Sequence, residues 1–179
     1  MLIAAREEVL AKTDKFEMTM EREPTRVTLR LSGVIDEDTN LSTVLDNVRR
    51  MIDSLSEIHF DLAGVTRINS CGVREWLLLM ERLPLKLQKV FLSVSEFFVE
   101  QTNMVPNMLG GKSSKILAFE APYHCTACKE DFQVVLAPSQ VTFRGESPVP
   151  PKIMCQRCGG TMDFAWLPDE YLAFVKRMG

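Results

Sequence analysis

The chain has 179 residues, of which 46% are hydrophobic and 25% are charged, and its formal net charge is −3. This composition supports a globular core, and the lack of a basic excess argues against a nucleic-acid-binding protein. No apolar run is long enough to cross a membrane. The charged residues within 1–10 argue against a secretory signal peptide. We therefore expect no membrane insertion, a cytoplasmic location and no structural disulfides.

The N-terminal part of the chain predicts an arm followed by two strands. Residues 1–15 are rich in Ala, Arg, Glu and Leu, which predicts a short N-terminal helix or a loosely held arm. Apolar and polar residues alternate over 16–22 and again over 26–32, as they do in half-buried strands. Pro24 and Thr25 separate the two runs, so the sequence predicts a hairpin.

Helical and strand patterns then alternate as far as residue 120. Apolar residues recur at helical spacing over 41–52, which predicts an amphipathic helix against one face of a sheet. A second such helix is predicted over 96–103, with Ser95 as its N-cap. Further strands are predicted at 57–62, 89–94 and 115–120. The sequence therefore predicts an α/β fold, a mixed sheet with helices on one face.

The stretch from Asp61 to Met80 predicts a strand end, a tight polar loop and a helix. Apolar residues recur at helical spacing from Val73 onward, and Gly72 allows close packing where the helix begins. Ser70 then lies at a helix N-terminus, where backbone N–H groups are free and the dipole is positive. A phosphate on this hydroxyl would be accommodated there.

This stretch resembles the phosphorylation loop of the STAS domain, the family of anti-sigma-factor antagonists. Members carry a strand, a D-x-x-x-V-x-x-I/M-D-S-S-G-type loop and a helix. The equivalent positions here are Asp61, Val65, Ile68, Asn69, Ser70, Cys71 and Gly72. The chain departs from the family pattern twice, because Asn69 stands in place of an aspartate and Cys71 in place of the second serine. The order of predicted elements over 16–120 agrees with the same fold.

The resemblance implies a regulatory protein–protein interaction module rather than an enzyme. By position, Ser70 is the residue that a partner kinase phosphorylates, and Asp36 is the acidic residue that faces the loop. The implied partner is an anti-sigma factor or a serine kinase-like regulator, which would contact Asp36, Asn69, Ser70, Cys71 and Gly72. Asp36 also has a simpler interpretation, because acidic residues ahead of a helix stabilise its N-terminus.

Two C-x-x-C pairs give the strongest chemical signal in the chain. They are Cys125 with Cys128 and Cys155 with Cys158, separated by 26 residues. Each pair can place two thiolates on one side of a tight turn, and two facing turns supply the tetrahedral four-sulfur shell that Zn²⁺ prefers. Strand-like segments between and after the pairs make the region similar to a zinc ribbon. We therefore expect Zn²⁺ at these four cysteines.

The cysteine pattern has one competing interpretation, a dithiol redox site. A second pair in the same small region disfavours it, and a shell of four cysteines leaves no position for a catalytic water. The sequence thus predicts two domains: a STAS-like domain at 1–120 and a zinc-ribbon-like β module at 121–179, the latter ending in a helix that begins at Pro168.

Two further functions stay open beside the phosphorylation switch. The chain could be a constitutive scaffold in a multi-protein assembly, with the switch lost and Asn69 as the trace of that loss. It could also be a nucleic-acid-associated regulator that acts through its zinc ribbon. Six basic and six acidic residues over 121–179 give the ribbon no basic excess, which argues against nucleic acid as a partner. The sequence leaves the oligomeric state open.

Overall fold

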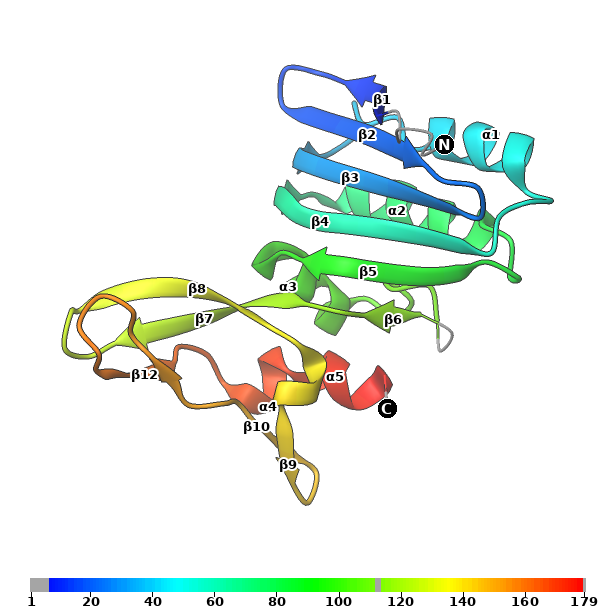
Figure 1. Ribbon diagram of the computed structural model, residues 1–179. Helices are drawn as coiled ribbons and strands as arrows, with labels where there is room; N and C mark the ends of the chain where they lie inside the picture. Colours follow the sequence, from blue (N-terminus) through cyan, green and yellow to red (C-terminus); the bar gives the residue numbers. More distant parts are fainter. Residues whose placement is uncertain (1–6, 112–113, 179) are drawn as a thin grey trace, which may run out of the picture.

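The structure is a computed structural model that describes residues 7–111 and 114–178. Its main feature is a mixed ten-stranded sheet in the order β1-β2-β3-β4-β5-β7-β12-β11, with β6 beside β5 and β8 beside β7 (Figure 1). The strands are β1 (Glu7–Lys12), β2 (Phe16–Arg22), β3 (Arg26–Ile35), β4 (Glu57–Ile68), β5 (Gln88–Val94), β6 (Lys115–Ile116), β7 (Phe119–Cys125), β8 (Glu130–Leu136), β11 (Ile153–Met154) and β12 (Thr161–Phe164). The α/β class expected from the sequence is confirmed.

The predicted N-terminal helix or arm is wrong for the residues that the structure describes, because 7–12 form the edge strand β1. This strand runs antiparallel to β2, with Glu7 opposite Glu21 and Lys12 opposite Glu17. Lys12 and Glu17 also form an ion pair at 2.7 Å. Pairing with the open edge of β2 satisfies the backbone of this segment, which outweighs a weak helical composition. The rest of the prediction concerns residues 1–6, which lie outside the described residues.

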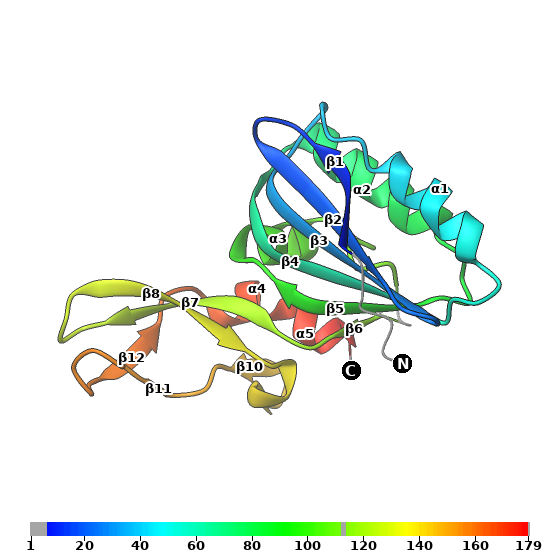
Figure 2. The same cartoon turned by 45° about the horizontal axis from the view of Figure 1, so that its top comes forward.

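Three helices cover one face of the sheet, as predicted. They are α1 (Ser42–Met51), α2 (Ser70–Arg82) and α3 (Glu96–Met104), and Figure 2 shows α1 and α2 next to each other on one side of the strands. β3, β4 and β5 are parallel, so each connection between them crosses the sheet through a helix. The apolar residues of strands and helices meet in a core around Trp76, whose ring packs edge-on against Phe60 and Phe98.

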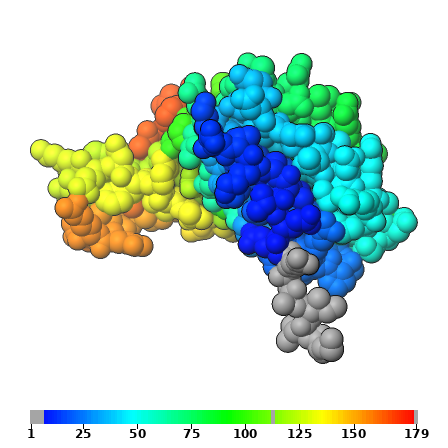
Figure 3. All heavy atoms as spheres, turned by 90° about the horizontal axis from the view of Figure 1, so that it is seen from above, coloured from blue at the N-terminus to red at the C-terminus, as the bar shows by residue number. Residues whose placement is uncertain are grey.

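β7 joins the two parts of the molecule. It contacts the end of β5 at a single register pair, Val94 with Phe119, and then runs outward between β8 and β12. This outer part projects sideways from the rounded body in the view from above (Figure 3). The sequence predicts one strand over 115–120, whereas the structure has β6 and then β7. The predicted domain boundary after residue 120 falls inside β7.

The last helical segment returns to the body of the protein. It consists of two short helices, α4 (Pro168–Tyr171) and α5 (Ala173–Met178), and Pro168 occupies the first turn as predicted. Phe174 packs edge-on against Phe119, and Asn103 of α3 donates to the backbone carbonyl of Tyr171 at 2.7 Å. A short 3-10 turn (Pro138–Gln140) and a separate hairpin, β9 (Thr142–Arg144) with β10 (Ser147–Val149), complete the fold.

Candidate metal centre and partner-binding loop

The four cysteines of the C-x-x-C pairs converge at the outer end of β7. Cys125 is the last residue of β7, and Cys155 directly follows β11. The four Sγ atoms lie within 4.8 Å of one another. Cys125 and Cys155 are buried, Cys128 is half-buried and Cys158 is exposed. The predicted convergence of the two pairs is confirmed, and the cluster could hold a metal ion.

The two cysteine turns have the same backbone geometry. Lys129 N–H donates to the carbonyl of Cys125 at 2.7 Å, and Gly159 N–H donates to the carbonyl of Cys155 at 2.8 Å. The residue that closes each turn has a positive φ, 57° at Lys129 and 73° at Gly159. A glycine adopts this conformation at little cost, which explains why one follows the second pair. Each turn therefore brings its two sulfurs to the same side of the chain.

The sulfur positions fit a tetrahedral metal site. The sulfurs of Cys125 and Cys158 lie 3.5 Å apart, and those of Cys128 and Cys155 lie 3.8 Å apart. Four zinc–sulfur bonds of about 2.3 Å in a tetrahedron place the sulfurs about 3.8 Å apart. Backbone N–H groups point at two of the sulfurs, from Cys128 to Cys125 and from Gly160 to Cys158, both at 3.4 Å. Such donors stabilise thiolates.

Ionisation of the cluster is consistent with metal binding. The backbone N–H of Cys158 and, more weakly, that of Arg157 lower the pKa of Cys155 to about 7, against desolvation. Interaction with the Cys158 sulfur, and then burial, raises the pKa of Cys128 to about 12. Thiolates are the ligands of a metal ion, so binding of a cation releases the protons that the cluster still carries.

Two pairs of charged or polar side chains lie next to the cluster in the sequence. Arg157 of the second turn forms an ion pair with Glu130, which directly follows the first turn, and so links the two turns. His124 lies beside Cys125 in the sequence, but its Nδ1 is 2.7 Å from Asp131. The histidine is therefore held by a carboxylate, and four sulfurs complete the candidate shell among the described residues.

The second candidate site is the loop that leads into α2. Ser70 is the first residue of this helix, and both Ser70 and Cys71 are exposed. Asn69 is the N-cap, and its side-chain oxygen accepts from the N–H of Gly72 at 2.8 Å. A side chain at Gly72 would overlap the backbone carbonyl of Ile35, so the predicted need for close packing is confirmed. The described first turn of α2 holds no acidic residue.

An acidic side chain reaches this loop, but it is Glu37 rather than Asp36. Asn69 Nδ2 donates to the Glu37 carboxylate at 2.8 Å, and this hydrogen bond lowers the pKa of Glu37. The Asp36 carboxylate instead accepts from the N–H of Asp38 at 3.1 Å, within its own turn. Sequence reasoning missed Glu37 because three acidic residues in a row give no sign of which one faces a neighbouring loop.

The comparisons with known proteins leave the family open. No model of a known protein family matches the chain, and no curated protein matches it either. Among the helices of residues 7–111 and 114–178, none has the length and apolarity that a membrane crossing requires.

Proposed function

We propose that this protein is a non-catalytic regulatory binding protein of the STAS type, with its partner-binding site at the start of α2. Ser70 is the proposed phosphate acceptor, and Asn69, Cys71, Gly72 and Asp36 form the contact surface with it. The partner is a protein, an anti-sigma factor or a serine kinase-like regulator. Glu37 joins this surface because it is hydrogen-bonded to Asn69.

The observation that carries the proposal is the exposed hydroxyl of Ser70 in the first turn of α2. An exposed side chain at this position is accessible to a kinase. The helix dipole favours a negative charge there, and no carboxylate of the described first turn opposes it. Glu37 accepts from the side chain of Asn69, the residue next to Ser70, so a phosphate of about −1.5 to −2 charges would disturb this contact. Phosphorylation would thereby change both the charge and the shape of the surface.

Zn²⁺ is the ion we propose for the four-cysteine cluster. Four thiolates at tetrahedral spacing are the donor set of structural zinc sites, and no position is left for a reacting water. The residues that would hold the ion are Cys125, Cys128, Cys155 and Cys158. The zinc would connect two turns that the ion pair of Arg157 with Glu130 also links, so its role is structural.

A constitutive scaffold is the second candidate, and the role of Asn69 favours it. Both ends of the Asn69 amide are used, one on Gly72 and one on Glu37. A residue that is needed as a cap is retained even where a phosphorylation switch is lost. The scaffold and the switch predict the same fold and the same partner surface, and they differ only in the response to charge at Ser70.

The test is a pull-down from the native host with purified protein as bait, with and without ATP, followed by intact-mass analysis of the bait. The switch predicts a retained partner and one added phosphate, which is absent in Ser70→Ala. Ser70→Ala and Ser70→Asp should change partner retention in opposite directions. The matched control is Ser42→Ala, because Ser42 is likewise exposed at the first position of a helix, α1.

The outcomes separate the candidates. A partner that is retained equally by all variants, with no phosphate under any condition, would favour the scaffold. Loss of the partner from Ser42→Ala as well would contradict a surface confined to the start of α2.

A further inference from the structure

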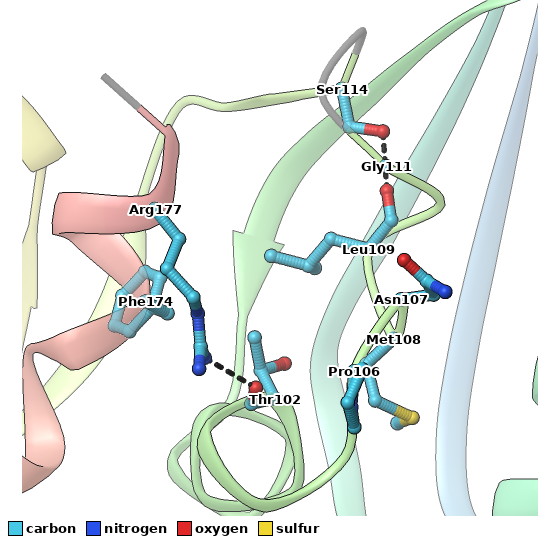
Figure 4. A pocket seen from close by; sticks show the side chains of 9 residues that line it. All are labelled: Thr102, Pro106, Asn107, Met108, Leu109, Gly111, Ser114, Phe174 and Arg177. Atoms are coloured by element: carbon cyan, nitrogen blue, oxygen red, sulfur yellow. Dashed lines mark hydrogen bonds between the residues drawn. The ribbon is translucent and has the colours of Figure 1, made fainter.

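A cavity lies between the end of α3, the segment that follows it and α5. Its volume is about 280 Å³, which is near the lower end for small-molecule sites. Figure 4 shows the side chains of Phe174 and Arg177 on one side of this space and that of Leu109 on the other, with Thr102 next to the Arg177 guanidinium. The cavity therefore lies where the C-terminal helices pack against the body of the protein, and it is apart from both sites described above.

The wall of the cavity is mostly apolar and carries one charged group. Phe174, Met108 and Leu109 are buried side chains whose surfaces face it. Arg177 supplies the only charge among the described lining residues, and none of these residues is acidic. The described lining of the cavity thus carries a positive charge, although the whole chain has a net charge of −3.

The Arg177 guanidinium is hydrogen-bonded only to neutral groups in the described part of the chain. Its Nη2 donates to the Thr102 carbonyl at 2.6 Å, at the C-terminal end of α3, and lies 3.4 Å from the Asn103 side-chain oxygen. These contacts orient the planar group of this exposed residue, and they leave Nε and Nη1 without a partner among the described residues and open to solvent. A guanidinium with two adjacent free N–H groups can form two parallel hydrogen bonds with a carboxylate.

We propose that this cavity binds a small organic monoanion, with a carboxylate on Arg177 and an apolar body against Leu109 and Phe174. A neutral apolar molecule would leave the guanidinium unpaired. A fully polar anion would bury no apolar surface against the wall. A ligand here contacts both α5 and the segment after α3. Its binding would stabilise the packing of the C-terminal helices on the body.

The experiment uses the full zinc-loaded chain and three probes of equal length: hexanoate, 1-hexanol and hexylammonium. Backbone amide chemical shifts are followed by NMR during titration with each probe. Hexanoate should shift the amides around Leu109 and Phe174 in a saturable manner. Hexanol and hexylammonium should bind up to about fivefold more weakly than hexanoate, since an ion pair with an exposed arginine contributes up to about 1 kcal/mol.

The matched variants are Arg177→Met, which keeps the aliphatic stem, and Arg144→Met, which removes an exposed arginine on β9. Arg177→Met should weaken hexanoate binding up to about fivefold, and Arg144→Met should leave it unchanged. Equal binding of hexanoate and hexanol by the unaltered protein would overturn the proposal, and so would the absence of shifts at these amides. The probe comparison decides the matter even if Arg177→Met fails to fold.

Discussion

The two parts of this molecule keep their strands together by different means. In β2 to β5, the side chains on one face are buried against α1, α2 and α3, and apolar packing supplies the stability. In the outer part, β9 is exposed along its whole length and β8 alternates between exposed and half-buried residues. The buried side chains of the outer part lie mainly beside the C-terminal helices, and the four-cysteine cluster lies at its far end, where a cross-link would hold the two cysteine turns together.

This difference predicts that removing a cysteine disrupts only the outer part. Cys155→Ser removes a buried residue of the four-cysteine cluster, and we expect loss of the proposed zinc together with a free energy on the order of 10 kcal/mol that the ion would contribute to folding of this region. Zinc per chain is measured by native mass spectrometry, and the two parts are followed by amide NMR. Amides of β2 to β5 should keep their positions. Cys71→Ser is the control, and its zinc content should stay at one per chain.

A substitution in the core of the body should have the opposite pattern: it should lower the free energy of unfolding and leave the metal content unchanged. Trp76 is buried, and its indole N–H donates to the Met108 carbonyl at 2.6 Å. Trp76→Ala should lower the free energy of unfolding by about 3–5 kcal/mol, because it leaves a cavity and an unpaired carbonyl. Zinc content should not change in the fraction that remains folded. Trp166→Ala is the control, since Trp166 is 46% exposed. Equal losses in the two variants, measured by urea unfolding, would contradict the proposed position of the core.

The start of α2 allows a test of close packing. Gly72→Ala would place a methyl group against the carbonyl of Ile35, and we expect a loss of about 1–3 kcal/mol in the free energy of unfolding. Cys71→Ala, one residue earlier and exposed, should change it by less than about 0.5 kcal/mol. Thermal unfolding of both variants measures the difference. A neutral Gly72→Ala would show that this helix start has room to move.

Two helix N-caps of the body differ in a way that mutation can resolve. Asn69 accepts from the N–H of Gly72, whereas Ser95 at the start of α3 has a buried hydroxyl with no partner among the described residues. Asn69→Ala should cost about 0.5–2 kcal/mol. Ser95→Ala should be nearly neutral or slightly stabilising, because it removes an unpaired polar group. Chemical unfolding of the two single variants gives both values, and a larger cost at Ser95 would reverse the comparison.

The smallest expected effect is a change in titration at Glu37. The hydrogen bond from Asn69 lowers the pKa of this carboxyl, so the contact is present above the ordinary value of 4.5 and is lost as pH falls through the lowered pKa. Asn69→Ala should move the Glu37 pKa upward, as measured by carbon NMR of the carboxyl group. Ser70→Ala keeps the Asn69 amide and should leave the pKa where it is. Equal values in both variants would mean that Asn69 and Glu37 do not meet.

Local patterns in the sequence were sufficient to predict the elements whose structure depends on neighbouring residues. Alternation predicts β2 and β3, helical spacing predicts α1 and α2, and the two C-x-x-C pairs indicate a four-sulfur cluster from spacing alone. Each of these features depends on residues a few positions apart, or on two short motifs with one shared chemistry. The likeness of Asn69-Ser70-Cys71 to a phosphorylation loop has the same local origin, and it stays a prediction.

Tertiary structure decided the features that depend on distant partners. Residues 7–12 form β1 because the edge of β2 was open for pairing, which their own composition does not reveal. Glu37 rather than Asp36 meets Asn69 because the turn after β3 directs one of three acidic side chains toward α2. Arg177 reaches Thr102, 75 positions earlier, because α5 returns to α3. A backbone group or a charge pairs with a partner that the fold brings close to it. For partners far apart in the sequence, the sequence separation does not indicate their distance in space.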